Sequence, residues 1–369
     1  MRVDEVELRQ IRLPLVAPFR TSLGTMVERD VLLVHVRAAS AEGWGECVAL
    51  PEPGYSPEWV DGAHEVLRRF LAPPLLAAND VAVEEVADRL AFVKGHHMAK
   101  AALEMAVLDA ELRSRGQSLT SYLGGTRSRV EVGVSVGMAA SITDLLEAVS
   151  GYVDTGYRRV KLKIEPGWDL EPVAATRAHI GPQVTLQVDA NTAYSAGDID
   201  HLSRLDEHDL LLIEQPFPAD DLASHTALAA AMTTPVCLDE SIESVADAAL
   251  AIDMGACSVV NIKPGRVGGY IEARRIHDLC VARGVDAWCG GMLETGIGRA
   301  GNLALAALPG FTLPGDISAS DRYYSEDITE PFRLDDGHIA VPTGPGIGVE
   351  PNREILHRVT TSCERLARG

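Results

Sequence analysis

The chain contains few aromatic residues, few basic residues and no long apolar segment. Phe, Trp and Tyr make up 5% of its 369 residues, and 33 Lys and Arg stand against 53 Asp and Glu, which gives a formal net charge of −20. A surface of this charge repels phosphate backbones and anionic lipids, and no basic stripe offsets it. No uninterrupted apolar run reaches the ~18 residues that a membrane-spanning helix needs. We therefore expect neither nucleic-acid binding nor insertion into a membrane.

The sequence also lacks paired cysteines. Its six cysteines stand singly, without the CxxC spacing of a zinc or redox site. In a chain of this length we expect them to be buried small apolar residues or free thiols. The first fifteen residues carry acidic side chains and lack the apolar core of a signal peptide, so we expect a cytoplasmic protein. The cysteines are Cys47, Cys237, Cys257, Cys280, Cys289 and Cys363.

Five apolar, strand-like segments in the second half of the chain each end at a charged residue followed by a turn signal. Segments with helical spacing of apolar residues lie between them. Strands that alternate with helices predict repeated βαβ units and a parallel sheet covered on both faces. The five segments are RRVKLKI (158–164), VTLQVDAN (184–191), DLLLIEQP (209–216), TPVCLDES (234–241) and SVVNIKP (258–264).

The spacing of these charged ends is that of a barrel. Asp189 and Glu214 are 214 − 189 = 25 residues apart, and Glu214 and Asp239 are 239 − 214 = 25 residues apart. Eight βα units of a TIM barrel take about 250 residues, and such enzymes place their chemistry at the carboxyl ends of the strands. We predict an α/β fold, a (β/α)7β TIM-like barrel, in which the five segments are strands 2 to 6. Strands 1, 7 and 8 are assigned to 130–138, 285–291 and 311–316.

An α+β module precedes the barrel. Alternating runs at 3–15, 29–37 and 42–50 predict an antiparallel meander, with Gly43 and Gly45 as bulge or turn positions. Helical spacing follows at 57–76 and 81–93, and in an amphipathic helix at 98–114. We expect a capping domain at 1–125, the barrel at 126–320, and a Gly- and Pro-rich segment at 321–369 that returns to the capping domain.

Charged residues at the ends of these strands are expected to meet at the mouth of the barrel. Lys161 and Lys163 are two residues apart and so share one face of their strand, and Lys263 ends a strand across the mouth. Asp189, Glu214 and Asp239 end the three strands between them. Three convergent carboxylates without neighbouring His or Cys favour Mg²⁺, with Mn²⁺ or another divalent cation as an alternative, over zinc.

This set of groups suits the removal of a proton α to a carboxylate. The cation would stabilise the enediolate, while one lysine takes the proton and the other faces the opposite side of the carbanion. A second ammonium beside the basic lysine lowers its pKa toward neutrality. Any one of these acids alone would be read as a helix cap or a turn residue. Their common placement at strand ends with barrel spacing favours the functional interpretation.

The segments KLKI, QVDAN, LIEQP, CLDES and VNIKPGRVGG resemble the enolase superfamily, specifically its muconate-lactonising subgroup. The resemblance covers almost the whole chain, including LPLVAPFRTSLGT, EGWGEC and MAKAALEMAVLDAELR. It is greatest to the o-succinylbenzoate synthases that also act as N-acylamino-acid racemases, through VKLKIEPGWD, NIKPGRVGGYIEARR, WCGGMLETGIGRA and TLPGDISASDR. Members of this group form symmetric homo-oligomers, so the resemblance also implies a homo-oligomer.

The resemblance implies a role for each matched position. Asp189, Glu214 and Asp239 correspond to the Mg²⁺ ligands, and Lys163 and Lys263 to the acid/base pair. In racemisation the two lysines would exchange the α-proton across the substrate plane. In dehydration one lysine would remove the α-proton and help expel the β-hydroxyl, while Lys263 stabilises the enolate. Lys161 and Asn191 match positions beside the enolate oxygens.

The capping domain of such proteins selects the tail of the substrate through two loops, which here correspond to 16–27 and 48–59. We assign Phe19, Tyr55, Met292 and Tyr323 to this wall, with Leu23, Met26, Leu50 and Leu293 beside them, and we add Ser135 of the first barrel strand to the substrate-binding set. Ordinary packing between domains is the alternative for the apolar members. PGDISASD at the eighth strand lacks the DxD pair of dipeptide epimerases, which disfavours a dipeptide substrate.

Two other interpretations remain at this stage. GIGRAG (296–301) matches a dinucleotide-binding motif, but it follows the seventh predicted strand with too little chain left for that fold. We expect its helix N-terminus to face a substrate carboxylate or no ligand. The reaction could also be that of a cycloisomerase or dipeptide epimerase of the same subgroup, or the barrel could bind a small carboxylate without turning it over.

Overall fold

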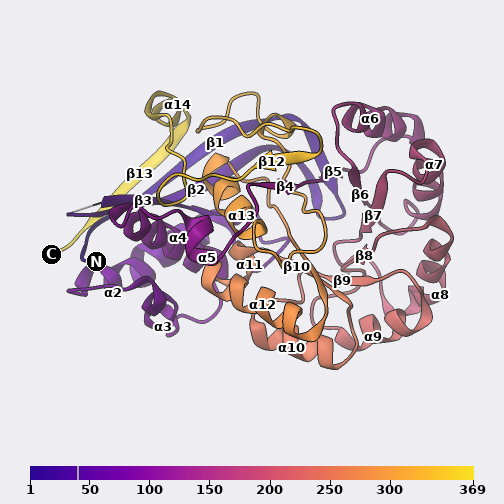
Figure 1. The fold of residues 1–369 in the computed structure, drawn as a ribbon, viewed down its shortest axis with the longest axis horizontal. Coiled ribbons are helices and arrows are strands. Elements are labelled where there is room, and N and C mark those ends of the chain that lie inside the picture. The colour runs from indigo at the N-terminus through magenta and orange to yellow at the C-terminus, as the bar shows by residue number, and fades with distance from the viewer. Residues whose placement is uncertain (40) are drawn as a thin grey trace.

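The computed structural model describes residues 1–39 and 41–369. Figure 1 shows an antiparallel sheet that holds both chain termini at one end of the molecule, and a curled parallel sheet ringed by helices at the other. The predicted α/β class with an α+β capping region is therefore confirmed. The predicted domain boundaries at 125/126 and 320/321 stay predictions.

The antiparallel sheet has the strand order β13-β1-β2-β3. The C-terminal strand pairs antiparallel with the first, from Glu5 opposite Ala367 onward, so the last residues of the chain lie beside its first ones. The run 16–27, predicted as a loop, is instead the tip of a long hairpin, in which Phe19 lies opposite Met26. The strands are β1 (Val3–Thr21), β2 (Gly24–Ala38), β3 (Ala41–Cys47) and β13 (Thr360–Ala367).

Helix α4 (His97–Ser114) packs directly on strand β3. Gly43 and Gly45 pair regularly with Val36 and Val34 of β2, so their prediction as bulge or turn positions is wrong. A Cβ atom on Gly45 would overlap the carbonyl oxygen of Ala102 in α4, and one on Gly43 would overlap the backbone of the same helix. These glycines are needed because the helix backbone approaches the strand too closely for a side chain.

Gly45→Ala is expected to destabilise the protein by about 1–3 kcal/mol, because the added methyl group overpacks a backbone contact that cannot move without shifting α4. Gly151→Ala is the matched control. Gly151 lies within a helix, and a Cβ atom there meets nothing within 4 Å. Its replacement should stabilise that helix by about 0.5–1 kcal/mol. Urea denaturation of both variants measures the difference, and equal free energies of unfolding would contradict the close-approach explanation.

The prediction that α4 is amphipathic is also wrong, because the helix is buried on all sides between the antiparallel sheet and the barrel helices. Its acids Glu104, Asp109 and Glu111 are 2%, 0% and 4% exposed. Each accepts hydrogen bonds from backbone N–H groups of neighbouring segments. Glu104 accepts from Ile271, Asp109 from Trp44 and Ile347, and Glu111 from Val83.

Glu104→Gln is expected to remove the loss of folding stability that Glu104 causes as the pH rises from about 4.5 to 7. Burial raises the pKa of Glu104 from 4.5 to about 7 in the folded protein. The folded state therefore binds more protons than the unfolded state in this window, and the contribution of Glu104 to stability is full below pH 4.5 and is lost as the pH rises through 7. The glutamine variant should be more stable than wild type by up to about 3 kcal/mol at pH 8 and nearly equal to it at pH 4. Thermal unfolding at several pH values measures this difference, and a difference that is the same at both pH values would contradict it.

The barrel sheet is parallel and curled, with seven strands in the order β11-β10-β9-β8-β7-β6-β5. Adjacent strands pair in chain order, so the carboxyl ends of all of them lie at the same rim. The strands are β5 (Val134–Val136), β6 (Arg159–Lys163), β7 (Thr185–Asp189), β8 (Ile213–Glu214), β9 (Val236–Leu238), β10 (Val259–Ile262) and β11 (Asp286–Cys289).

Helices cover the outside of this sheet (Figure 1). Most of them begin at a side-chain N-cap, as Ser141, Asp169, Asp221 and Ser244 do for four of them. They are α6 (Ile142–Asp154), α7 (Leu170–Ile180), α8 (Ile199–Leu202), α9 (Leu222–Ala231), α10 (Val245–Asp253), α11 (Pro264–Val267), α12 (Tyr270–Arg283) and α13 (Gly296–Ala306).

The predicted eighth strand at 311–316 is not a strand. The segment nevertheless joins the two edges of the curled sheet, because Thr312 N–H donates to the carbonyl of Ala287 in β11, and Gly133 N–H, just before β5, donates to the carbonyl of Gly315. Pro314 lacks the N–H group that a regular strand would need. Isolated hydrogen bonds therefore close the barrel at this position.

Shorter elements complete the capping region and the connections. Among the described residues no helix combines the length and the apolar character required to cross a membrane. Of the cysteines, Cys363 is exposed, the others are buried, and all six are free thiols. The remaining α-helices and strands are α1 (Val60–Val66), α2 (Ala72–Ala77), α3 (Val86–Leu90), α5 (Leu119–Leu123), β4 (Arg129–Glu131), β12 (His338–Ala340) and α14 (Arg353–Val359).

Candidate functional site

A cavity of about 370 Å³ lies at the rim formed by the carboxyl ends of the barrel strands. Residues from the hairpin β1–β2 and from the segment after β3 form its outer wall, so both parts of the fold contribute to it. The structure brings both predicted acid/base lysines and every predicted substrate-binding residue to this one cavity. They are Phe19, Tyr55, Ser135, Lys161, Lys163, Asn191, Lys263, Met292 and Tyr323.

Strand β6 places two lysines on the cavity side, as their spacing predicts. The Lys161 ammonium lies 3.2 Å from Asp189, 3.1 Å from Glu214 and 2.6 Å from Asp316. The Lys163 ammonium lies 2.6 Å from Asp189 Oδ2 and donates to Asn191 Oδ1, also at 2.6 Å. Lys161 is thus surrounded by carboxylates, whereas Lys163 is held by one carboxylate and one amide.

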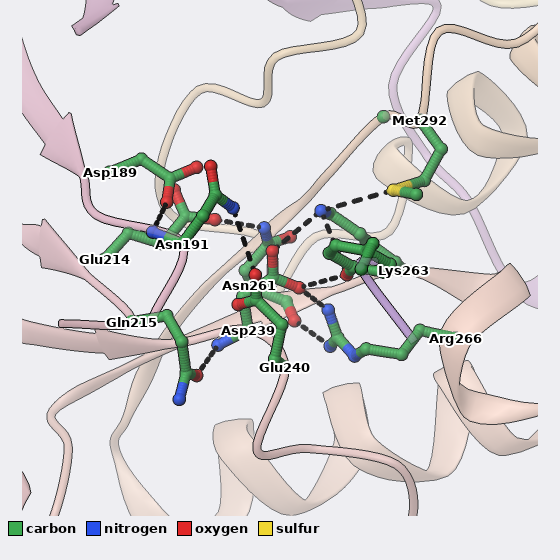
Figure 2. A network of polar contacts seen from close by, with 12 residues as sticks. Asp189, Asn191, Glu214, Gln215, Asp239, Glu240, Asn261, Lys263, Arg266 and Met292 are labelled. Carbon is green, nitrogen blue, oxygen red and sulfur yellow. Dashed lines mark hydrogen bonds and ion pairs between the residues drawn. The ribbon is translucent and has the colours of Figure 1, made fainter. Parts of the chain in front are cut away.

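The third lysine reaches the cavity from the other side. Lys263 follows β10, and β7, β8 and β9 separate it from β6. Its ammonium donates to Asp239 Oδ2 at 2.7 Å and to the Tyr55 hydroxyl at 3.3 Å, and it lies 3.5 Å from Met292 Sδ (Figure 2). Lys163 and Lys263 therefore flank the space between them from opposite ends of a row of strands.

The three predicted metal ligands end or follow the strands between those lysines. Asp189 ends β7, Glu214 ends β8, and Asp239 follows β9. They are 1%, 0% and 0% exposed, and each contacts at least one of the cavity lysines. None of these three acids is among the residues that line the cavity, and each contacts a lysine that is.

Burial and charge shift the two acid/base candidates in opposite directions. Burial and the charge of Lys161 lower the pKa of Lys163 below its ordinary value, although Asp189 opposes the shift. Burial alone would lower the pKa of Lys263 too, but Tyr55, Glu214 and other acidic groups around it raise that pKa above its ordinary value. Lys163 is therefore the better proton acceptor and Lys263 the more persistent cation.

The donor set at these strand ends fits a hard divalent cation. The three carboxylates offer only oxygen, which Mg²⁺ and similar ions prefer. Beside them, Glu240 Oε2 and Asn261 Oδ1 are buried acceptor oxygens that have no hydrogen-bond donor among the described residues. As the side chains lie, each of the three carboxylates is paired with ammonium or guanidinium groups, and the described part of the chain contains no group of three His, Cys, Asp or Glu residues close enough to bind a metal.

Several residues of the site escaped the sequence analysis. Asp316 lies in the segment that closes the barrel, accepts from Gly291 N–H at 2.7 Å and pairs with Lys161. Lys161 and Arg159 outweigh the effect of burial and lower the pKa of Asp316 to about 2. Arg266 in α11 pairs with Asp239, and Asn261 donates to Glu214 at 2.8 Å. All three residues lie in segments that resemble the family, TLPGDISASDR and NIKPGRVGGYIEARR, but their residue types and spacing alone assign them no role.

Helix α13, which carries the GIGRAG motif, binds protein side chains at its N-terminus. Glu46 of β3 accepts from the N–H groups of Thr295 and Gly298, and Asp327 accepts from that of Gly296. The motif therefore holds the capping region against the barrel. It leaves no exposed N–H group at these positions for a dinucleotide phosphate.

Two family models match the chain along most of its length. Residues 4–124 match the mandelate racemase / muconate lactonizing enzyme N-terminal domain, and residues 144–355 match the enolase C-terminal domain-like model. A protein of Amycolatopsis sp. named N-succinylamino acid racemase is 59% identical over 98% of this chain and 98% of its own. A protein of Bacillus subtilis named o-succinylbenzoate synthase is 44% identical over 99% of this chain and 98% of its own.

Solved structures agree with the sequence relatives. A crystal structure from Listeria innocua, described as a member of the enolase superfamily, superimposes with a TM-score of 0.96 at 40% identity and covers 100% of both chains. The match extends through the capping region as well as the barrel. With the family models, the relatives and the solved structure in agreement, the chain belongs to the enolase superfamily, and its N-terminal domain is that of mandelate racemase and muconate lactonizing enzyme.

Proposed function

We propose that the protein is a divalent-metal-dependent enzyme that removes a proton α to a carboxylate, as o-succinylbenzoate synthase, as N-acylamino-acid racemase, or as both. The observation that carries the proposal is the placement of Lys163 and Lys263 on opposite sides of one cavity, with three buried carboxylates between them. The names of the most similar relatives point to the same two activities. Each begins with the same proton removal, so one site geometry can serve both.

The lysines carry the proton transfers in this proposal. Lys163, with its lowered pKa, accepts the α-proton of a substrate that lies across the cavity. Lys263 faces the opposite side of the resulting planar carbon. In racemisation Lys263 returns a proton from its side, which inverts the centre. In dehydration it stays protonated and stabilises the negative charge.

Members of the enolase superfamily generally use a divalent metal. We propose Mg²⁺, with Mn²⁺ or another divalent cation as an alternative, and assign Asp189, Glu214 and Asp239 as the residues that would hold it. When bound, the cation supplies positive charge that stabilises a carboxylate substrate and the enediolate formed from it. Lys161 and Asn191 lie beside these acids and are assigned to the same carboxylate end of the substrate.

The outer part of the cavity is apolar and selects the tail of the substrate in this proposal. Phe19 and Tyr323 meet edge to face with ring centroids 6.2 Å apart, and Leu50 and Met292 line the same space. Ser135 and Tyr55 add polar groups. An aryl or N-acyl tail fits such a wall. We further propose that the enzyme works in the cytoplasm as a homo-oligomer.

The test compares kcat/KM for 2-succinyl-6-hydroxy-2,4-cyclohexadiene-1-carboxylate with kcat/KM for the two enantiomers of an N-succinyl amino acid, at saturating Mg²⁺. We expect turnover of at least one substrate type and deuterium incorporation at the α-carbon of N-succinyl amino acids in D₂O. Binding of these acids without turnover or isotope exchange would favour a carboxylate-binding barrel and refute the enzyme.

A further inference from the structure

We propose that Glu240 is a positioning residue for Lys163, which acts by fixing the amide of Asn191 so that the amide oxygen holds the lysine ammonium. The inference rests on the proposed function, because it concerns one of the two proton-transfer groups. It assigns a task to a buried acid that is neither a proposed metal ligand nor a wall of the cavity.

A continuous chain of hydrogen bonds joins the three side chains. Lys163 Nζ donates to Asn191 Oδ1 at 2.6 Å, and Asn191 Nδ2 donates to Glu240 Oε1 at 3.0 Å. Figure 2 shows the Asn191 amide directed at Glu240. The three residues are 9%, 5% and 9% exposed, so water has little access to any link of the chain.

Glu240 determines which end of the amide faces the lysine. An asparagine amide has an acceptor oxygen and a donor nitrogen, and only the oxygen can accept from an ammonium group. If the amide were rotated by half a turn, its NH₂ group would face Lys163 and its oxygen would face the carboxylate. The carboxylate of Glu240 favours the NH₂ group on its own side, and thereby leaves the amide oxygen on the side of Lys163.

The backbone of Asn191 is already fixed, so the amide is the part that still needs an orienting partner. Its N–H group donates to Asp189 Oδ1 at 3.0 Å, and its φ of +41° lies in the left-handed region, which asparagine tolerates better than most residues. Asn191 follows β7 by two residues, and Glu240 follows β9 by two. The amide–carboxylate contact thus spans the strand that lies between them.

Among the described residues, no amide–carboxylate pair of this kind holds the second lysine, Lys263. Within residues 1–39 and 41–369, Lys263 has Asp239, Tyr55 and Met292 Sδ as its hydrogen-bond partners, and neither Asn191 nor Glu240 is among them. Loss of the Asn191–Glu240 hydrogen bond should therefore lower proton transfer more on the Lys163 side than on the Lys263 side, which Glu240 reaches only through its charge. Glu240 also adjoins the proposed ligand Asp239, and a change that acted through the metal site would affect proton transfer by both lysines. A larger loss on the Lys163 side therefore distinguishes a positioning role from a general structural one.

The experiment follows deuterium incorporation at the α-carbon of each enantiomer of an N-succinyl amino acid, at saturating Mg²⁺. The enantiomer served by Lys163 is identified first, as the one whose exchange is lost in Lys163→Ala. Glu240→Leu removes the acceptor and should lower exchange with that enantiomer about tenfold, the size of one oriented hydrogen bond to a charged group. Exchange with the other enantiomer, for which Glu240 acts only through its charge on Lys263, should change several-fold less.

Two further variants test the route of the effect. Glu240→Gln keeps a carbonyl oxygen that can accept from Asn191, and should restore most of the lost exchange. Glu240→Leu combined with Asn191→Leu should exchange as slowly as Asn191→Leu alone, because residues that act through one contact are not additive. Glu240→Ala replaces the leucine variant if that variant does not fold.

Equal loss with both enantiomers, additivity in the double variant, or a weakened Mg²⁺ affinity in Glu240→Gln would overturn the positioning role. These results differ from a failure of the proposed function, which would appear as an absence of exchange in the wild-type enzyme. Mg²⁺ affinity is measured separately, by isothermal titration, so that an effect on the metal is not read as an effect on Lys163.

Discussion

Replacing Lys163 or Lys263 by alanine should abolish α-proton exchange with one enantiomer each, and racemisation with both. Each lysine faces one side of the cavity, Lys163 from β6 and Lys263 from beyond β10. Removal of the lysine therefore removes the proton acceptor for one face of the substrate only. A positioned general acid or base contributes about 10²–10⁴-fold, so exchange with the affected enantiomer should fall by that factor. Proton NMR in D₂O, with each enantiomer supplied alone, measures both rates.

The pair of variants is informative because their effects should be reciprocal. Lys163→Ala is expected to retain exchange with the enantiomer that Lys263 serves, and Lys263→Ala the converse. Lys94→Ala is the matched control, since this lysine is exposed and lies outside the cavity. If each variant lost exchange with both enantiomers to the same degree, while circular dichroism showed an intact fold, the assignment of the lysines to opposite faces would be wrong.

The positions of these lysines and of the acids between them were predictable because the sequence marks the end of each strand by a charged residue after an apolar run. Lys163, Asp189 and Glu214 each terminate an apolar run, and each also ends a strand in the structure. In a parallel sheet such ends must meet at one rim. The two-residue period of a strand was enough to place Lys161 beside Lys163 on the cavity side.

Other parts of the structure could not be predicted because they depend on contacts between distant segments. Asp316 lies in a segment without regular strand pairing, where period and length carry no information. Arg266 has the pattern of a surface base in a short turn, yet it is 3% exposed and pairs with Asp239. The acids of α4 look like a solvent-facing stripe because the sequence of a helix does not reveal that a second layer covers it.

Gly45 shows, at a single position, the difference between what local sequence predicts and what contacts between distant segments determine. Gly45 was predicted as a bulge because glycine in a strand often marks one. The structure shows regular pairing of Gly45 with Val34 of β2, and a helix backbone against its missing side chain. Local sequence therefore predicts that a glycine is needed, while the physical reason becomes visible only when the packed helix is in place.

Removal of the divalent metal, or of one of its proposed ligands, should have the largest effect on activity. Glu214 is the most informative of these proposed ligands to change, since it is 0% exposed and contacts both Lys161 and Asn261. Glu214→Gln keeps the size of the side chain and removes its charge. We expect α-proton exchange by the wild-type enzyme to disappear in a chelator and to return with Mg²⁺. At the Mg²⁺ concentration that saturates wild type, the exchange rate of the variant should be lower by at least about 10³-fold, because charge stabilisation of a transition state is worth several kcal/mol.

Thermal unfolding gives an independent readout of the same site. A ligand that binds only the folded state at 100 times its dissociation constant stabilises it by about 2.7 kcal/mol, so Mg²⁺ should raise the unfolding temperature of wild type. The Glu214→Gln variant should show little of this rise. Asp221→Asn is the control, because Asp221 caps α9 through the N–H of Ser224, and asparagine caps equally well. If Mg²⁺ stabilised Glu214→Gln as much as wild type and Asp221→Asn, Glu214 would not be a ligand, and the three acids would serve only to balance the charge of the cavity lysines.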